Sequence, residues 1–499
     1  MSIPSAPRRL LIVLVLACGL ESSCRQAVAE ELTAFPSTGL GAQCGKWFDA
    51  FNSGDYATMR QMHLSTDLEP VANRRALRDY QVYLMTRGVM PAAVEQAGPN
   101  TFSISGREKL SGNWVNLVVR GSTKAPFSVM EFGLRPGKAP QSESTDPRPT
   151  EFEALQDFDA MLTRLSDADE FSGAALVAKD GKVIFKKAWG KADHVTGAMN
   201  RTDTKFNLAS AGKMFTGVAV LQLVQENKLA LDDTVGKHLG DYANKDVREQ
   251  VTIRQLLTHT SGLGEMFNAR YKAERERLRS VKAFVSLFEN DPLRFKPGSR
   301  WGYSNAGYCL LGAIVEKVSG EDYYDYLDKH VFAPAGMRNT GAFETDKPID
   351  NLAIGYTRDG AETPEELRAR RDNIKLHVVK GSPAGGSFST VEDLERFAAA
   401  VLGHKLLNAD YTRLAMSAQA KTGLGDDASG FGFQIEPANG HAVVGHRGGF
   451  QGISASFFMY PDDGHVVVLL SNYDSVAPVL ALRMRDWIAS GAIPAKTKG

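Results

Sequence analysis

Two residues that stand three positions apart, Ser210 and Lys213, are the pair in this chain that is best suited to covalent chemistry. Positions i and i+3 share one face of a helix, and the apolar residues that follow Lys213 recur at helical spacing. A lysine one turn away can take the proton of a serine hydroxyl, which makes the serine a nucleophile. Backbone N–H groups at the start of such a helix would also stabilise an oxyanion. The pair predicts acyl transfer through Ser210.

The Ser-x-x-Lys pattern is short, and it gains meaning only from partners that occur further along the chain. Tyr303 supplies a phenol that can shuttle a proton, and Asn305 supplies an amide that can bind a substrate carbonyl. A predicted strand then carries polar side chains and glycines whose backbone a substrate can approach closely, namely His446, Arg447, Gly448 and Gly449. A nucleophile, a proton acceptor, an acid and two oxyanion donors are what a serine hydrolase requires.

These segments occur in an order that resembles the serine β-lactamase and penicillin-binding-protein family, in its class C-like branch of esterases and aminopeptidases. Further stretches support the resemblance: LLTHTSG (256–262), FKPGSRWGYSNAGYCLLGAIVEKVSG (295–320), AGGSFSTVEDLERF (384–397) and GFGF (430–433). The resemblance covers about residues 153–491. It implies an α/β (α+β) fold, in which an antiparallel sheet is flanked by helices and carries an inserted helical subdomain.

The resemblance also implies a role for each residue of the constellation. Ser210 matches the acylated nucleophile, and Lys213 matches the lysine that lowers the pKa of that serine and shares its proton. Tyr303 matches the general base that later acts as the acid, and Asn305 matches the residue that orients the lysine and a substrate amide. The backbone N–H groups of Ser210 and Gly449 would form the oxyanion hole.

The chain departs from the family pattern on the later strand, where His446-Arg447-Gly448 replaces Lys-Thr-Gly. The lysine of that motif helps to bind the carboxylate of a β-lactam, and histidine is a weaker, pH-dependent cation. Arg447 would bind a carboxylate if its side chain points into the cleft. We therefore expect hydrolysis of an ester or amide, possibly a peptide. The alternatives are a catalytically silent ligand-binding member, or a true β-lactamase or D-alanyl carboxypeptidase.

Other matches to the short patterns are interpreted as structural. Tyr242-Ala243-Asn244 and His238-Leu239-Gly240 fit the same spacings but lie out of family order, so we expect ordinary loop residues there. His259 is expected to hold a helix end. The shape of the pocket is expected to depend on residues 270–290 and 361–382, and the charge-rich stretch 361–372 is expected to be an exposed loop.

Composition limits the class of partner. The 499 residues contain 58 Lys plus Arg and 58 Asp plus Glu, so the formal net charge of zero argues against general nucleic-acid binding. No Cys or His spacing indicates a metal site, and we expect no cofactor. The expected partner is a small ester or peptide-like substrate.

The chain is expected to divide into four parts. Residues 1–29 are read as a signal peptide, because two arginines precede a short apolar run and Ala27-Val28-Ala29 fits a cleavage site; lipidation at Cys18 fits less well. The protein is thus expected to be secreted or periplasmic, without an integral membrane span. Residues 30–137 read as helices followed by strands and weakly resemble the cone-shaped α+β fold typified by nuclear transport factor two. This accessory domain is a candidate for mediating oligomerisation. A linker (138–150) and the hydrolase domain (151–493) follow.

Overall fold

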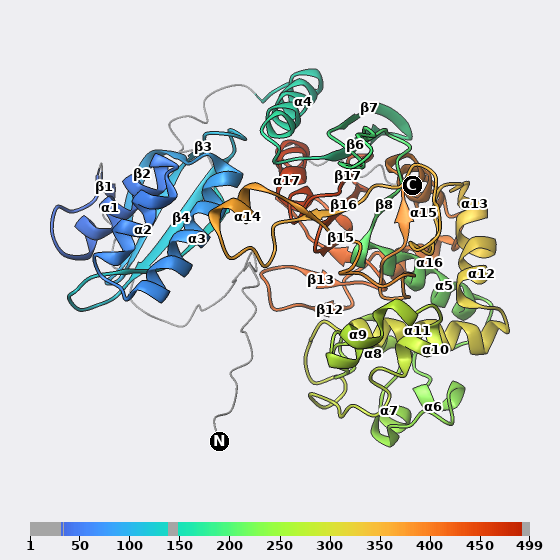
Figure 1. Ribbon diagram of the computed structural model, residues 1–499. Coiled ribbons are helices and arrows are strands. Elements are labelled where there is room, and N and C mark those ends of the chain that lie inside the picture. Colours follow the sequence, from blue (N-terminus) through green and yellow to red (C-terminus); the bar gives the residue numbers. More distant parts are fainter. Residues whose placement is uncertain (1–30, 33, 138–147, 492–499) are drawn as a thin grey trace, which may run out of the picture. The chain divides into compact units, whose positions relative to one another are not determined.

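The computed structural model describes residues 31–32, 34–137 and 148–491 and divides them into two compact units (Figure 1). The first unit comprises residues up to 148 together with 160–170 and 358–370, and the second comprises 149–159, 171–357 and residues from 371 onward. The predicted signal peptide, including Cys18, and most of the predicted linker lie outside the described residues.

The first unit has the expected order of helices followed by an antiparallel sheet. The helices are α1 (Gly39–Ser53), α2 (Tyr56–Leu64) and α3 (Glu69–Thr86), and the strands, in spatial order, are β1 (Glu31–Leu32), β2 (Val89–Gly98), β3 (Thr101–Glu108), β4 (Trp114–Gly121) and β5 (Val129–Pro136). Every second residue of β3 and β4 is buried, because successive side chains of a strand point to opposite faces. Figure 1 shows the helices along one face of this sheet.

A polar cluster lies inside the first unit. The indole Nε1 of Trp47 donates to Asp79 Oδ2 at 2.7 Å, and His63 Nε2 lies 2.7 Å from the same oxygen. Arg78 Nη2 pairs with the other oxygen at 2.9 Å. Trp47, His63 and Asp79 are all fully buried, so each depends on the others for hydrogen bonds that water cannot supply.

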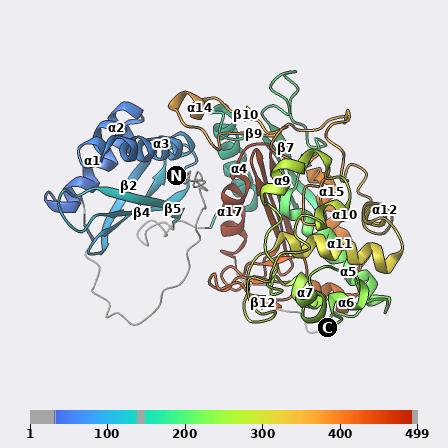
Figure 2. The same cartoon turned by 60° about the horizontal axis from the view of Figure 1, so that its bottom comes forward.

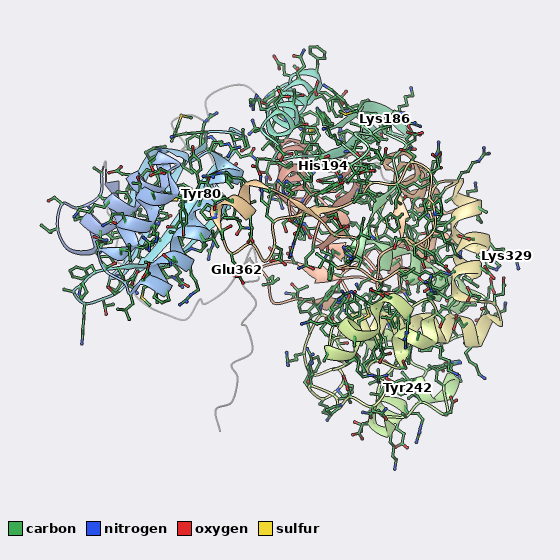
Figure 3. All side chains as sticks on the ribbon, in the orientation of Figure 1. Tyr80, Lys186, His194, Tyr242, Lys329 and Glu362 are labelled. Carbon is green, nitrogen blue, oxygen red and sulfur yellow. The ribbon has the colours of Figure 1, made fainter. Side chains whose placement is uncertain are left out.

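The first unit also takes residues 160–170 and 358–370, which lie inside the stretch 151–493 that the sequence assigns to the hydrolase domain. Within the first unit, helix α14 (Pro364–Arg368) packs Leu367 against α3, and Leu367 is only 1% exposed. Arg368 donates to the hydroxyl of Tyr80, which Figure 3 labels, at 2.8 Å. The expectation of an exposed loop at 361–372 is therefore wrong for its centre, because one leucine among many charges anchors the segment.

The second unit is built on an eight-stranded antiparallel sheet that takes strands from both ends of its sequence, as expected. In spatial order these are β12 (Ala420–Lys421), β13 (Ala428–Ser429), β14 (Gln434–Ile435), β15 (Val444–Phe450), β16 (Ile453–Tyr460), β17 (His465–Ser471), β6 (Gly173–Lys179) and β7 (Lys182–Trp189). Two small pairs, β8 (Phe206–Asn207) with β11 (Phe388–Ser389) and β9 (Tyr356–Thr357) with β10 (Arg371–Asp372), lie outside it.

Helices cover both faces of this sheet. On one face α17 (Ala477–Ile488) packs against β16 and β17; on the other, α15 (Val391–Leu402) packs against β17 and β6 (Figure 2). Phe397 of α15 links α5 (Lys213–Gln225) to the sheet, because its ring lies 5.0 Å from that of Phe215 and 6.0 Å from that of Phe457. The spacing of its apolar residues predicts one buried face for helix α5, but nearly all of its residues are buried in the structure.

The remaining helices lie mainly between α5 and β11 in the sequence. They are α4 (Glu151–Asp167), η2 (Ala209–Gly212), α6 (Val235–His238), α7 (Lys245–Gln250), α8 (Ile253–Leu257), α9 (Ala269–Glu274), η3 (Arg275–Arg277), α10 (Val281–Val285), α11 (Asn305–Ser319), α12 (Tyr323–Leu327), η4 (Asp328–Phe332), α13 (Ala333–Ala335) and α16 (Ala409–Ala415). Most form the expected helical insert. Within the described ranges, no helix has the length and apolar character needed to cross a bilayer.

Candidate active site

Ser210 lies on a tight turn between strand β8 and helix α5. The turn is the 3₁₀ segment η2, and its first residue, Ala209, has a φ of +43°, which is uncommon for a residue with a Cβ. Asn207 Oδ1 accepts from the Ala209 N–H at 2.8 Å, and the Ala209 carbonyl accepts from the Gly386 N–H at 3.0 Å. Neighbouring segments therefore hold the strained turn on both sides, and the prediction that Ser210 and Lys213 share one helical stretch is correct.

Strand β15 approaches this turn so closely that Gly448 cannot carry a side chain. A Cβ at Gly448 would lie 1.9 Å from the Leu208 carbonyl oxygen. The next residue, Gly449, lines the same cavity as Ser210. Gly448 thus permits the close backbone approach that brings together Ser210 and Gly449, the two residues expected to supply the oxyanion donors.

Lys213 is fully buried and held by two oxygen atoms. Its Nζ donates to Asn305 Oδ1 at 2.7 Å and to the Ala384 carbonyl at 2.5 Å, and it lies 4.9 Å from the centre of the Tyr303 ring. Burial lowers the pKa of Lys213 to about 7, although the carboxylate of Glu265 opposes this shift. A large fraction of the lysine is therefore neutral near pH 7, and a neutral amine can accept a proton.

Tyr303 is fixed on one side by His259. The two rings stack with centroids 4.3 Å apart, the Ser304 N–H donates to His259 Nδ1 at 3.1 Å, and the Gly302 N–H donates to the His259 carbonyl at 2.8 Å. Burial holds the pKa of His259 well below its usual value, so the ring is neutral and its Nδ1 can accept. His259 thus binds the backbone on both sides of Tyr303, through Gly302 and Ser304. It also lies just after the end of helix α8, where the sequence places it.

The Tyr303 hydroxyl faces the nucleophile. Burial raises the pKa of the Tyr303 phenol above its usual value, while a hydrogen bond with Ser210 partly offsets the shift. The resting group is therefore a neutral phenol, which can pass a proton along but does not carry a standing negative charge.

Glu265 is a site residue that the sequence reasoning missed. Its Oε2 accepts from Asn305 Nδ2 at 2.7 Å, while the other end of the same amide accepts from Lys213. Burial raises the pKa of the Glu265 carboxyl, and its charge favours protonated Lys213. Glu265 follows the LLTHTSG stretch by three residues, so its nearness to a recognised segment was the only signal that could have identified it.

His446 and Arg447 do not line the cavity that contains Ser210. His446 is 3% exposed, and its Nδ1 contacts the Arg447 carbonyl. Burial, reinforced by the positive charge of Lys213, lowers the pKa of His446 to about 3, so the ring is neutral. Arg447 would bind a substrate carboxylate only if its side chain pointed into the cleft, and it does not: its guanidinium pairs with Glu436 and lies 5.4 Å from the Phe458 ring. Adjacent side chains of a strand point to opposite faces, and Arg447 follows His446 directly.

The cavity has a volume of about 340 Å³ and lies within the second unit. Ser210, Tyr303, Asn305 and Gly449 contribute to it, together with Tyr271 and residues of the segment 373–379, so both stretches expected to shape the pocket take part. Its larger apolar and aromatic lining residues include Met266, Phe267, Leu352, Ile354, Ile374 and Phe450. None of the lining residues is Asp, Glu, Lys or Arg.

The other matches to the short patterns lie away from this cavity. Neither Tyr242 nor His238 lines it; His238 pairs with Asp233 at 2.9 Å. Figure 3 labels Tyr242 in the part of the helical insert around α6 and α7. Within the described part of the chain, no group of three or more His, Cys, Asp or Glu residues could hold a metal ion.

Comparisons with known proteins show the family and the fold of the second part of the chain. The family described as Beta-lactamase matches residues 158–489. Penicillin-binding protein 4* of Bacillus subtilis (strain 168) is 30% identical over 327 residues, which cover 62% of this chain and 70% of that protein. The crystal structure of a penicillin-binding protein from Bacillus halodurans is 31% identical with a TM-score of 0.59, and the match covers 65% of this chain and 98% of that one. EstCE1, a hydrolase with promiscuous acyltransferase activity, is 25% identical with a TM-score of 0.55, over 67% of this chain and 98% of that one.

Proposed function

Because the chain belongs to the Beta-lactamase family, we propose that it is a serine hydrolase that forms an acyl-enzyme at Ser210 and cleaves carboxylic esters or amides, peptides included. The observation that carries this proposal is the buried Lys213, whose amine is held by Asn305 and Ala384 beside the nucleophile. A lysine that is fully buried and close to neutral is costly to keep, and such groups are concentrated at catalytic sites.

In the acylation step the Ser210 Oγ attacks the carbonyl carbon and its proton passes to the Lys213 amine, directly or through the Tyr303 phenol. The carbonyl electrons move onto oxygen, where the N–H groups of Ser210 and Gly449 stabilise the oxyanion. When the carbonyl re-forms, the bond to the leaving group breaks, and Tyr303 gives that group a proton and regains one from protonated Lys213. Asn305 keeps the ammonium in place during this exchange.

In the deacylation step water repeats the attack on the ester at Ser210. The same lysine and tyrosine take the proton of the water, and Ser210 Oγ leaves with a proton returned to it. Because acylation of the free enzyme uses the neutral Lys213 amine as its proton acceptor, kcat/KM should fall as the pH drops below about 7, where the lysine becomes protonated.

The experiment that tests the proposal is covalent labelling of the full chain, by a fluorophosphonate, which phosphonylates a reactive serine with loss of fluoride, and by a short-chain chromogenic ester, which acylates it, followed by intact mass spectrometry. We expect one adduct on the wild type and none on Ser210→Ala. Equal adduct formation or equal turnover by the two proteins would show that the nucleophile is elsewhere. Ligand binding without an adduct and without turnover would instead favour a catalytically silent binding protein.

A further inference from the structure

The cavity around Ser210 differs in charge from a site that holds a substrate carboxylate. We infer that the substrate is an ester or amide whose acyl group is uncharged and apolar, and that carboxylate-bearing acyl groups are rejected. This inference rests on the proposed function, since it assumes acylation at Ser210. The acyl group stays attached to Ser210 after the leaving group has gone, so a cavity that surrounds Ser210 has to hold it through both half-reactions.

The wall of the cavity, as the structure describes it, carries no cation. Among the lining residues, all of which belong to the described part of the chain, there is no Lys or Arg. Arg447 is occupied by Glu436 on the other face of β15. A carboxylate in this cavity would therefore lose its hydration without gaining a charged partner, which is costly.

Aromatic and aliphatic side chains form part of the wall. Phe450, the residue after the expected oxyanion donor Gly449, lies 5.6 Å from Phe267 and 4.7 Å from His377 between ring centroids. Burial lowers the pKa of His377 to about 4, so this ring too is uncharged near neutral pH. Ile374 extends the apolar surface and is 58% exposed although it lines the cavity. An exposed isoleucine at a cavity rim is available to an apolar ligand.

Glu265, the carboxylate of the hydrogen-bond network around Lys213, does not line the cavity. Its carboxylate accepts from Asn305, and it is not among the lining residues. A positively charged acyl group is therefore not favoured either, and ammonium-terminated esters serve as a separate arm of the test.

The experiment compares p-nitrophenyl esters of a chain-length series, from acetate to octanoate, with carboxylate-terminated and ammonium-terminated esters of matched length. We expect kcat/KM to rise about fourfold for each added methylene until the cavity is full. We expect the carboxylate-terminated ester to be at least about tenfold poorer than its neutral counterpart. A flat series, or a preference for either charged ester, overturns the inference.

A reciprocal variant sharpens the result. Ile374→Lys introduces a cation at the rim without burying it, and should move the carboxylate-to-neutral ratio at least about tenfold toward the charged ester. Val195→Lys, which changes a 92% exposed valine outside the cavity, is the matched control and should leave the ratio as in the wild type. Ratios within one variant cancel any change in overall activity, and an unchanged ratio in Ile374→Lys counts against the inference.

The design separates the two proposals. If no ester gives a Ser210-dependent adduct, the proposed hydrolase function fails. If adducts form but the acyl-group preference is absent or reversed, only the inference about the acyl group fails.

Discussion

Replacing Lys213 by methionine should abolish acylation and should also change how stability depends on pH. Folding brings the pKa of this lysine from 10.5 to about 7, because the ammonium loses its hydration. Between these two values the unfolded chain binds a proton that the folded chain does not. The free energy of unfolding of the wild type therefore rises with pH in this window, and Lys213→Met removes that contribution.

The magnitude follows from the shift. Each pH unit inside the window is worth about 1.4 kcal/mol, so the difference between wild type and Lys213→Met should change by about 2.5 kcal/mol from about pH 7.5 to about pH 9.5. The absolute difference at one pH is less informative, because Asn305 and Ala384 each lose a donor at roughly 1–3 kcal/mol per group. The pH dependence is free of that loss, since the lost hydrogen bonds are the same at every pH.

The assay is urea unfolding at several pH values. Each of the two units can give its own unfolding transition, and the one whose midpoint shifts when Ser210 is covalently labelled belongs to the catalytic unit. The free energy of unfolding is read from that transition. Lys329→Met, which removes an exposed lysine of the same unit (Figure 3), is the matched control and should differ from the wild type by a constant amount. A constant difference for Lys213→Met as well would mean that Lys213 is a cation in the resting protein, and the proposed proton acceptor would have to be abandoned.

Three further predictions concern the strand, the acidic neighbour and the first unit. Gly448→Ala should lower kcat/KM at least about a hundredfold with the circular dichroism spectrum retained, because the new methyl group pushes β15 off the nucleophile turn; activity near that of the wild type would refute the close approach. Glu265→Gln should move the acid limb of the pH–kcat/KM profile to lower pH, since the carboxylate that raises the pKa of Lys213 is gone, and an unmoved limb would remove Glu265 from the network. Asp79→Ala should destabilise the first unit by roughly 3 kcal/mol in urea unfolding, because the Trp47 N–H then lacks its buried acceptor, whereas a change below about 0.5 kcal/mol would contradict that role.

Much of the fold could be predicted from the sequence, because local rules and chain order agree. The pattern from Ser210 to Lys213 indicated a helix start, and the apolar runs near 173–189 and 444–471 indicated one sheet made from both ends of the hydrolase part. Those elements are long and regular, and their burial decides their conformation. The helix-then-sheet order of the first unit was predictable for the same reason.

The features that sequence reasoning missed depend on contacts between distant residues. Glu265 matters because a loop brings it to Asn305, and Leu367 matters because it is the one apolar side chain that a charged segment buries. His259 stacks on Tyr303 although the two residues are 44 positions apart in the chain, and neither residue type predicts this contact. No periodicity reports which single polar residue a fold will bury or expose.

The role of the His446-Arg447-Gly448 motif depends on which way its side chains point, and the sequence does not give these directions. In the sequence, His446 and Arg447 are both candidates to replace the carboxylate-binding lysine of the Lys-Thr-Gly motif. In the structure His446 faces the buried side beside Lys213, where a second positive charge is disfavoured and its ring is neutral. Arg447 faces the other side and is neutralised by Glu436. The His446-Arg447-Gly448 motif therefore places no side chain in the cavity. The residues of this strand that line the cavity are Gly449 and Phe450, and selectivity for the acyl group rests on the apolar wall to which Phe450 belongs.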